Sequence, residues 1–256
     1  MTDVYSHPDY QQFLARVRER PDDDVVRLVC ADWLEDRGQG DRAEFIRRQC
    51  EYARLRVKRG QETASQWITA LAIDSAVEQG RWFPGDFGGP FFKTRLLDNG
   101  MIQVEYEAEG GANPEIVYDR GFVSRVSGPL ASLHGGECVA SCHETGNICD
   151  GGRTTAPSPA FTRECRSCHG TGHTPGVLTE LLRREPVGCA GIEVTDFQPI
   201  QIGGGPWSLA QWRLSPSQRD LAASLPYETF PTADSARLAL SRALYSIHAP
   251  KIEVSR

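Results

Sequence analysis

The chain has 256 residues, of which 39% are hydrophobic and 24% charged, and its formal net charge is −6. This composition is that of an ordinary globular protein, and the acidic balance excludes a basic field over the whole molecule, though not a local basic patch for nucleic acid. No apolar run approaches the roughly 20 residues of a membrane span, and the first residues lack the basic-then-apolar pattern of a signal peptide. We therefore expect a cytoplasmic protein with no membrane partner.

Apolar residues recur at helical spacing over residues 8–80, and we expect helices at 10–20, 21–38, 41–59 and 64–79. Asp22 is the expected N-cap of the second helix, because its carboxylate can accept hydrogen bonds from the free N–H groups there. The residues expected to face the core are Val26, Val29, Cys30 and Trp33 in the second helix, and Ile46, Cys50, Ala53 and Val57 in the third. Trp33 and Phe45 are expected to be core anchors.

Glycine and proline at 81–90 indicate a linker, after which strand patterns begin. Alternating apolar residues around Asn99-Gly100 predict a hairpin over 91–107. The remaining expected elements are strands at 121–127, 190–202 and 207–214, and helices at 129–134, 177–185, 215–225 and 232–247, the last with Thr232 as N-cap.

Charged side chains are dense in the helical region. The carboxylates Asp32, Glu35, Asp36, Asp41 and Glu44 are expected to pair with Arg27, Arg37, Arg42, Arg47 and Arg48. Catalysis by two of these carboxylates would need them to converge in a cleft with separated pKa values, which the pattern does not indicate. Further arginines and lysines extend the third helix into a basic stripe: Arg47, Arg48, Arg54, Arg56, Lys58 and Arg59.

Residues 13–49 carry a series of motifs: Pro-Asp-Asp at 21–23, Arg-Leu at 27–28, Ala-Asp-Trp-Leu-Glu at 31–35, a glycine at 38, and Arg-Ala-Glu-Phe-Ile at 42–46 with Gln49. This segment resembles the repeat-companion domain of large-genome bacteria, chiefly planctomycetes and myxobacteria; Cys30 stands where an aromatic residue is more usual. The resemblance implies a helical module without established catalytic activity.

Residues 118–134 and 177–196 are similar to the strand–helix–strand unit that often follows this module. The resemblance thus implies an α+β protein, with a helical module at 1–82 and a small α/β, leucine-rich-repeat-like body at 83–256. A cysteine-rich insertion at 135–175 would then lie between a strand and its helix, or within that helix.

Five of the eight cysteines crowd into this insertion. Cys30, Cys50 and Cys189 lie among apolar neighbours and are expected to be small core residues. The ligand-capable side chains of the insertion are Cys138, Cys142, His143, Cys149, Cys165, Cys168, His169 and His173.

Two copies of one pattern stand out, "CVASCHETG" from Cys138 and "CRSCHGTG" from Cys165. The second resembles the Cys-x-x-Cys-x-Gly-x-Gly knuckle of DnaJ-type zinc fingers, which implies a local mode of metal binding only. Zinc prefers four ligands in a tetrahedron, and paired cysteines can supply two from one turn. We expect one structural zinc at Cys138, Cys142, Cys165 and Cys168, with Cys149, His143, His169 and His173 as alternative ligands.

Three alternatives to a single structural zinc remain open: two zinc ions, covalent haem at "CRSCH", and a catalytic Cys/His pair. Haem attachment follows export, for which no signal is visible, and paired cysteines favour a closed metal site over catalysis.

The sequence predicts a non-enzymatic protein-interaction or adaptor protein whose zinc-bound loop presents a rigid surface to a protein partner. Leu130, Phe161, Val177 and Leu178 are expected to pack at the base of this loop. The alternative is a nucleic-acid-binding accessory protein, in which Arg153, Arg163, Arg166 and the basic stripe contact phosphates.

Overall fold

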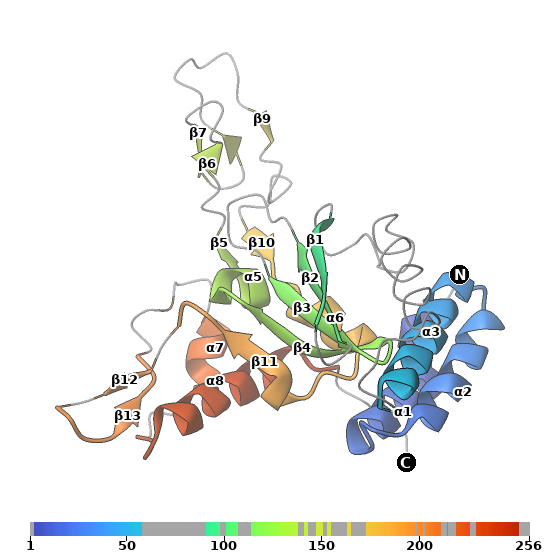
Figure 1. Ribbon diagram of the computed structural model, residues 1–256. Coiled ribbons are helices and arrows are strands. Elements are labelled where there is room, and N and C mark those ends of the chain that lie inside the picture. The colour runs from blue at the N-terminus through green and yellow to red at the C-terminus, as the bar shows by residue number, and fades with distance from the viewer. Residues whose placement is uncertain are drawn as a thin grey trace. The chain divides into compact units, whose positions relative to one another are not determined.

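The computed structural model describes residues 3–57, 91–97, 101–106, 114–137, 141–142, 147–150, 153–154, 163–164, 173–197, 199–201, 203–210, 214, 219–225 and 229–250. Helices and strands both occur among them (Figure 1), which confirms the α+β class. The predicted helix at 64–79 and the linker at 81–90 lie outside the described residues, as does the expected boundary after residue 82. The chain forms two compact units. The first contains Met1–Tyr106, Glu115–Val126 and Leu181–Gly191, and the second contains Glu107–Pro114, Ser127–Glu180 and Ile192–Arg256.

The first unit begins with helices, which Figure 1 draws in blue and cyan. They are η1 (Val4–Ser6), α1 (Pro8–Glu19), α2 (Asp24–Glu35) and α3 (Gly40–Val57). Asp23 caps α2, because its side chain accepts a hydrogen bond from the backbone N–H of Val25 at 3.0 Å. The prediction that Asp22 is the cap is therefore wrong by one residue. Asp22 instead accepts a hydrogen bond from Nη1 of Arg120 at 3.0 Å.

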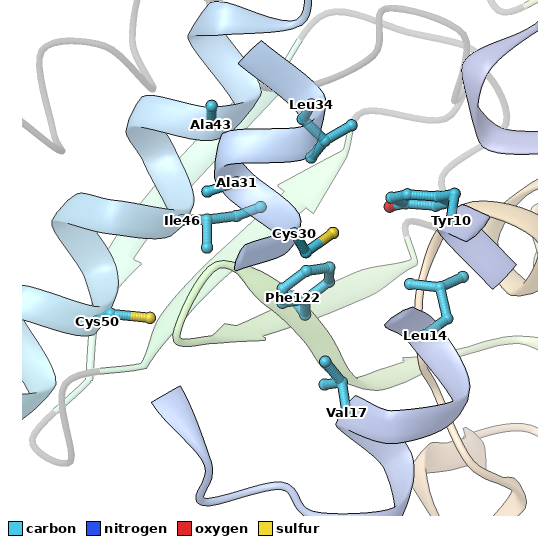
Figure 2. Close-up of a cluster of buried hydrophobic side chains, with 10 residues drawn as sticks. All are labelled: Tyr10, Leu14, Val17, Cys30, Ala31, Leu34, Ala43, Ile46, Cys50 and Phe122. Carbon is cyan, nitrogen blue, oxygen red and sulfur yellow. The ribbon is translucent and has the colours of Figure 1, made fainter. Parts of the chain in front are cut away.

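A hydrophobic cluster forms the core between these helices and the strand β4 (Phe122–Gly128). Figure 2 labels its buried members: Tyr10, Leu14, Val17, Cys30, Ala31, Leu34, Ala43, Ile46, Cys50 and Phe122. Phe45 is also fully buried, as predicted. Trp33 packs against the edge of the cluster and is only partly buried, so the prediction of a core anchor holds for Phe45 and is corrected for Trp33.

The buried face of α2 is shifted by one position along the sequence from the predicted face. Arg27, Cys30, Ala31 and Leu34 are buried, whereas Val29 is 48% exposed. Both sets repeat at i, i+3, i+4 and i+7, and a shift of one residue turns a helix face by about 100°. The apolar spacing predicted the wrong face because arginine is polar, so Arg27 was not counted among the core-facing residues. Its side chain is nevertheless buried, with the guanidinium carbon 5.9 Å from the centre of the Phe122 ring.

A sheet with the strand order β1-β2-β3-β4-β11 follows the helices in the chain. β1 (Phe91–Leu96) and β2 (Ile102–Tyr106) pair antiparallel from Leu96 opposite Ile102, which confirms the predicted hairpin; its turn at 98–100 lies outside the described residues. β3 (Glu115–Asp119) was not predicted. A two-residue turn joins it to β4, and both turn residues have positive φ, 47° at Arg120 and 85° at Gly121. Positive φ at both residues is typical of the two-residue hairpin turns whose backbone twist matches that of the flanking strands.

The second unit holds one long helix, α8 (Ala233–His248), and a number of short elements. The others that lie wholly within it are α5 (Leu130–His134), β5 (Gly135–Glu137), β6–β9 of the insertion, β10 (His173–Pro175), β11 (Ile192–Val194), β12 (Ile200–Gln201), β13 (Trp207–Ser208) and α7 (Arg219–Ser224). The predicted strands at 190–202 and 207–214 are thus much shorter than expected. Thr232 caps α8 in a capping box with Ser235, as predicted. Among the helices that the structure describes, none is long and apolar enough to cross a membrane.

Candidate functional site

The cysteine-rich insertion begins and ends in one short ladder, which we call the neck. β5 and β10 form it, with Gly135 opposite Pro175, Gly136 opposite Thr174, and Glu137 opposite His173 (Figure 1). α5 directly precedes β5, and α6 (Leu178–Arg184) follows β10. The insertion therefore separates α5 from α6, and it does not separate β4 from the helix that follows it.

Two glycines make the neck possible. Gly135 has a φ of 88°, a conformation that residues with a Cβ rarely adopt. A Cβ at Gly176 would overlap the backbone of Leu133, His134 and Gly135, so the two sides of the neck are in direct backbone contact. The backbone N–H of Val177 also donates to the carbonyl of Ser132 at 3.0 Å, which closes the base of the insertion.

The apolar residues predicted at the base of the insertion are only partly as expected. Leu130 and Leu178 are buried, at 5% and 0% exposure, and Val177 is partly buried. Phe161 lies outside the described residues.

Within the insertion, very short strands form a separate sheet, ordered β6-β7-β8-β9. Their bounds are Ser141–Cys142, Asn147–Asp150, Arg153–Thr154 and Arg163–Glu164. Cys142 pairs with Asn147 and Cys149 with Thr154, so two candidate ligands lie on neighbouring strands. β9 ends at Glu164, immediately before Cys165 in the sequence.

Some of the predicted zinc ligands lie in described strands, and the others lie outside the described residues. Cys142, Cys149 and His173 lie in described strands, and their positions are given by backbone register. Cys138, His143, Cys165, Cys168 and His169 lie outside the described residues. No group of three or more His, Cys, Asp or Glu side chains that could hold a metal occurs among the described residues. The zinc assignment therefore stays a prediction.

A histidine cluster lies at the neck. Nδ1 of His134, the last residue of α5, is 2.7 Å from Nε2 of His248 at the end of α8. Nδ1 of His248 is in turn 2.7 Å from Oγ1 of Thr179, in the first turn of α6. Burial and the neighbouring His134 lower the pKa of His248 to about 4. Sequence analysis missed this cluster, because its members are 114 and 69 residues apart and share no local motif.

A buried ion pair in the first unit is the second feature that sequence analysis missed. Nη2 of Arg42 donates to Oε1 of Glu185 at 2.6 Å, and both side chains are only 5% exposed. Oε2 of Glu185 accepts from the backbone N–H of Val123 at 3.0 Å. Burial alone would lower the pKa of Arg42, but the carboxylate of Glu185 and the nearby tyrosines together outweigh burial and raise that pKa. The pair is enclosed by packed side chains, so its role is structural.

The exposed charges of the helices pair partly as predicted. Nη2 of Arg47 lies 2.6 Å from both Asp32 and Glu35, and Arg48 lies 3.9 Å from Glu44. The hydrogen bonds that Arg47 donates to Glu35 and Asp32 raise the pKa of Arg47. Two arginines depart from the predicted surface pairing with nearby carboxylates: Arg42 pairs with Glu185 instead, and Arg27 is buried. The first two arginines of the predicted basic stripe therefore already bind carboxylates.

The three cysteines outside the insertion are all free, and they differ in burial. Cys30 and Cys50 are fully buried, as predicted, and burial raises the pKa of each to about 12 (Figure 2). Cys189 is only partly buried, which corrects its prediction as a core residue. Since nucleophiles and metal ligands are thiolates, Cys30 and Cys50 are suited to neither role.

Comparison of the chain with protein-family models, with curated proteins and with solved structures finds no match.

Proposed function

We propose that the chain is a non-enzymatic adaptor whose insertion is folded around one structural zinc and presents a surface to a protein partner. The observation that carries this proposal is the form of the insertion. It is closed at the neck by β5 and β10, yet its described strands beyond the neck are two to four residues long. Isolated hairpins of this length are marginally stable in water.

A structural zinc would stabilise these short strands. A structural zinc contributes roughly 10–16 kcal/mol of binding free energy, which is coupled to the folding of its site. We assign the ligands as Cys138, Cys142, Cys165 and Cys168, with Cys149 as the first alternative. Cys142 ends β6 and Cys165 directly follows β9, so each proposed pair has one member in or next to a strand of the insertion's sheet. Four thiolates would close the coordination shell and leave no position for a substrate.

We further propose that residues 83–256, apart from the insertion, form a leucine-rich-repeat-like body and that residues 1–82 form a helical repeat-companion module. The succession of β4, α5, α6 and β11, with β4 and β11 adjacent in the strand order, supports the proposed strand–helix–strand unit. Such a body would act as a scaffold for the insertion. The buried ion pair and the buried thiols Cys30 and Cys50 support a structural rather than a catalytic role for the first unit.

The zinc proposal is tested by elemental analysis of the purified full-length chain. We expect one zinc per chain in the wild type, and loss of zinc with faster proteolysis of the insertion in Cys165→Ser and Cys168→Ser. Cys189→Ser is the matched control, because Cys189 is a partly buried cysteine outside the insertion, and it should keep the metal. One zinc per chain in both knuckle variants would show that the ligands are assigned wrongly.

The partner proposal is tested by co-purification of the tagged chain from its native host, with Cys165→Ser in parallel. A protein retained by the wild type and lost with the zinc site supports an adaptor whose surface depends on the insertion. The nucleic-acid alternative predicts instead retention of DNA or RNA with a steep loss as salt rises. The pairing of Arg47 and Arg48 with carboxylates favours the protein partner.

A further inference from the structure

His248 bridges the two chain segments that enter and leave the insertion. Its Nε2 lies 2.7 Å from Nδ1 of His134, just before the neck, and its Nδ1 lies 2.7 Å from Oγ1 of Thr179, just after the neck. One imidazole on α8 therefore holds both sides of the neck. We propose that His248 is a latch on the neck, which is closed while at least one ring of the His134–His248 pair is neutral and released when both rings are protonated.

The hydrogen-bond chemistry of imidazole gives the latch its two states. A neutral ring has one N–H donor and one acceptor nitrogen, so two facing nitrogens can share one proton in a hydrogen bond. A proton added to His248 alone is disfavoured by burial but keeps both hydrogen bonds, because His248 can then donate to both Thr179 and His134. When both rings are protonated, an N–H faces an N–H at a separation of 2.7 Å, and the contact becomes repulsive.

The direction of the pH effect follows from the burial of the pair. Burial, and then the charge of His134, lower the pKa of His248 to about 4, against about 6.5 for an unperturbed histidine. Between about pH 6.5 and pH 4 the open neck binds more protons than the closed neck, so closure weakens as the pH falls through this window. Uptake of one proton on opening changes the open-to-closed ratio by at most about tenfold per pH unit.

Other ionisable groups on the surrounding elements do not set this pKa. Apart from His134, α5 carries no charged residue in its sequence. The remaining ionisable residues on β5, β10, α6 and α8, and on α7 and β11, which pack against α8, are Glu137, His173, Glu180, Arg183, Arg184, Glu193, Arg219, Asp220, Asp234, Arg237, Arg242 and Tyr245. None of them is among the causes of the lowered pKa of His248, which are burial and His134. The end of the α8 dipole favours a charged His248, and burial outweighs it.

Amide hydrogen exchange of the full-length chain tests the latch. We expect exchange at residues 132–137 and 173–179, corrected for the intrinsic rate at each pH, to rise by about tenfold or more between pH 6.5 and pH 4.5. His248→Gln removes the titrating ring and its bond to Thr179. The neck of this variant should exchange faster at pH 7.5 and respond little to pH.

Two further variants keep the test decisive if His248→Gln disrupts the neck altogether. His134→Asn retains an acceptor in place of Nδ1 but cannot be protonated, so we expect wild-type protection at pH 7.5 and a smaller rise on acidification. His7→Asn is the matched control, because His7 is a partly exposed histidine that caps α1 in the first unit. The neck of this variant should respond to pH as in the wild type. A response in His134→Asn as large as in the wild type would overturn the latch.

Acid also releases zinc from thiolates, so zinc content is measured in the same samples. A rise in exchange that follows zinc loss in every variant, whatever stands at 134 and 248, refutes the latch and leaves the zinc proposal standing. A histidine-dependent rise that persists in Cys165→Ser supports the latch independently of the zinc.

Discussion

The permanently charged guanidinium of Arg42 is buried among three aromatic rings. Its guanidinium carbon lies 5.4–5.8 Å from the ring centres of Phe45, Tyr118 and Phe122, and its single described carboxylate partner is Glu185. Removing two charges from water is unfavourable, and their attraction offsets this only when the geometry is good and the remaining lone pairs are satisfied. The backbone N–H of Val123 satisfies the second oxygen of Glu185. The pair therefore fixes the position of residues 181–191 against the helices of the same unit.

Replacing Arg42 by methionine should destabilise the protein strongly, because it leaves Glu185 buried without a counterion. We expect a loss of about 3–5 kcal/mol in the free energy of unfolding, measured by urea denaturation. The control is Arg47→Met: Arg47 also lies 2.6 Å from two carboxylates, but the pair is exposed, and the expected loss is at most about 1 kcal/mol. Equal losses in the two variants would contradict the structural role of Arg42.

Replacing both members of the Arg42–Glu185 pair should have the opposite effect on stability. In the double variant Arg42→Met with Glu185→Leu, both charges are replaced by apolar groups of similar length. Since a buried pair is often replaceable by well-packed apolar residues, most of the stability lost in Arg42→Met should return. The double-mutant cycle therefore measures a large coupling between the two residues, and additive losses would show that they act independently.

At the scale of elements, α3 packs directly against the β3–β4 turn in the first unit. Gln49 of α3 donates from Nε2 to the carbonyl of Tyr118 at 3.0 Å, and its Oε1 accepts from the backbone N–H of Gly121. One amide side chain thus binds both ends of the turn. A Cβ built on Gly121 would lie 2.5 Å from the Cα of Ile46, so the helix and the turn are in contact through a residue without a side chain.

Gly121→Ala should separate these two elements. Alanine meets a φ of 85° and a clash with Ile46, and we expect a loss of about 3 kcal/mol or more in the free energy of unfolding, combining left-handed strain with overpacking. Gly38→Ala is the matched control, since Gly38 has a similar φ of 78° but no atom within 4 Å of the added Cβ. Its expected loss is only about 1–2 kcal/mol, the strain alone. Urea denaturation of both variants distinguishes crowding from strain.

The elements that the sequence predicted well are those with local signals. Thr232 caps α8, and the pair Asn99-Gly100 predicted the hairpin of β1 and β2, because caps and hairpins have signals in a few adjacent residues. β3 was missed because the turn after it contains Arg120-Gly121. Arginine rarely adopts a positive φ, so this pair does not indicate a tight hairpin turn. The buried face of α2 was misplaced because the burial of Arg27 depends on Phe122, which lies far along the chain.

The contacts that define the candidate site were out of reach of the sequence for a similar reason. The neck joins α5 to the segment before α6 across the whole insertion, and His248 reaches it from the end of α8. Arg42 and Glu185 are 143 residues apart. Periodicity and spacing report on neighbours along a helix or strand, so they could indicate which residues have metal-binding chemistry but not which distant residues meet.

At the scale of the whole molecule, the chain passes repeatedly between its two units. The first unit takes residues from three separate stretches, Met1–Tyr106, Glu115–Val126 and Leu181–Gly191. Its core needs Phe122 from the second stretch, and Arg42 needs Glu185 from the third. A fragment that ends at residue 82 would lack both, and it would leave a buried cation unpaired. Long-range closure of this kind slows folding, because distant segments must meet before their contacts form.

The insertion, by contrast, should be removable without loss of the rest of the fold. Glu137 and His173 lie opposite each other in the neck, so Asn-Gly in place of residues 138–172 would join them as a two-residue hairpin. We expect unchanged far-UV circular dichroism outside the small contribution of the insertion, complete loss of zinc binding, and a gain of about 2 kcal/mol at most, because the loop that must be closed is much shorter. The control is the same replacement with Gly176→Ala, in which the added Cβ overlaps the backbone of Leu133, His134 and Gly135. That variant should lose the protection of the neck amides, whereas unfolding of the simple Asn-Gly variant would mean that the insertion is needed to hold α5 and α6 together.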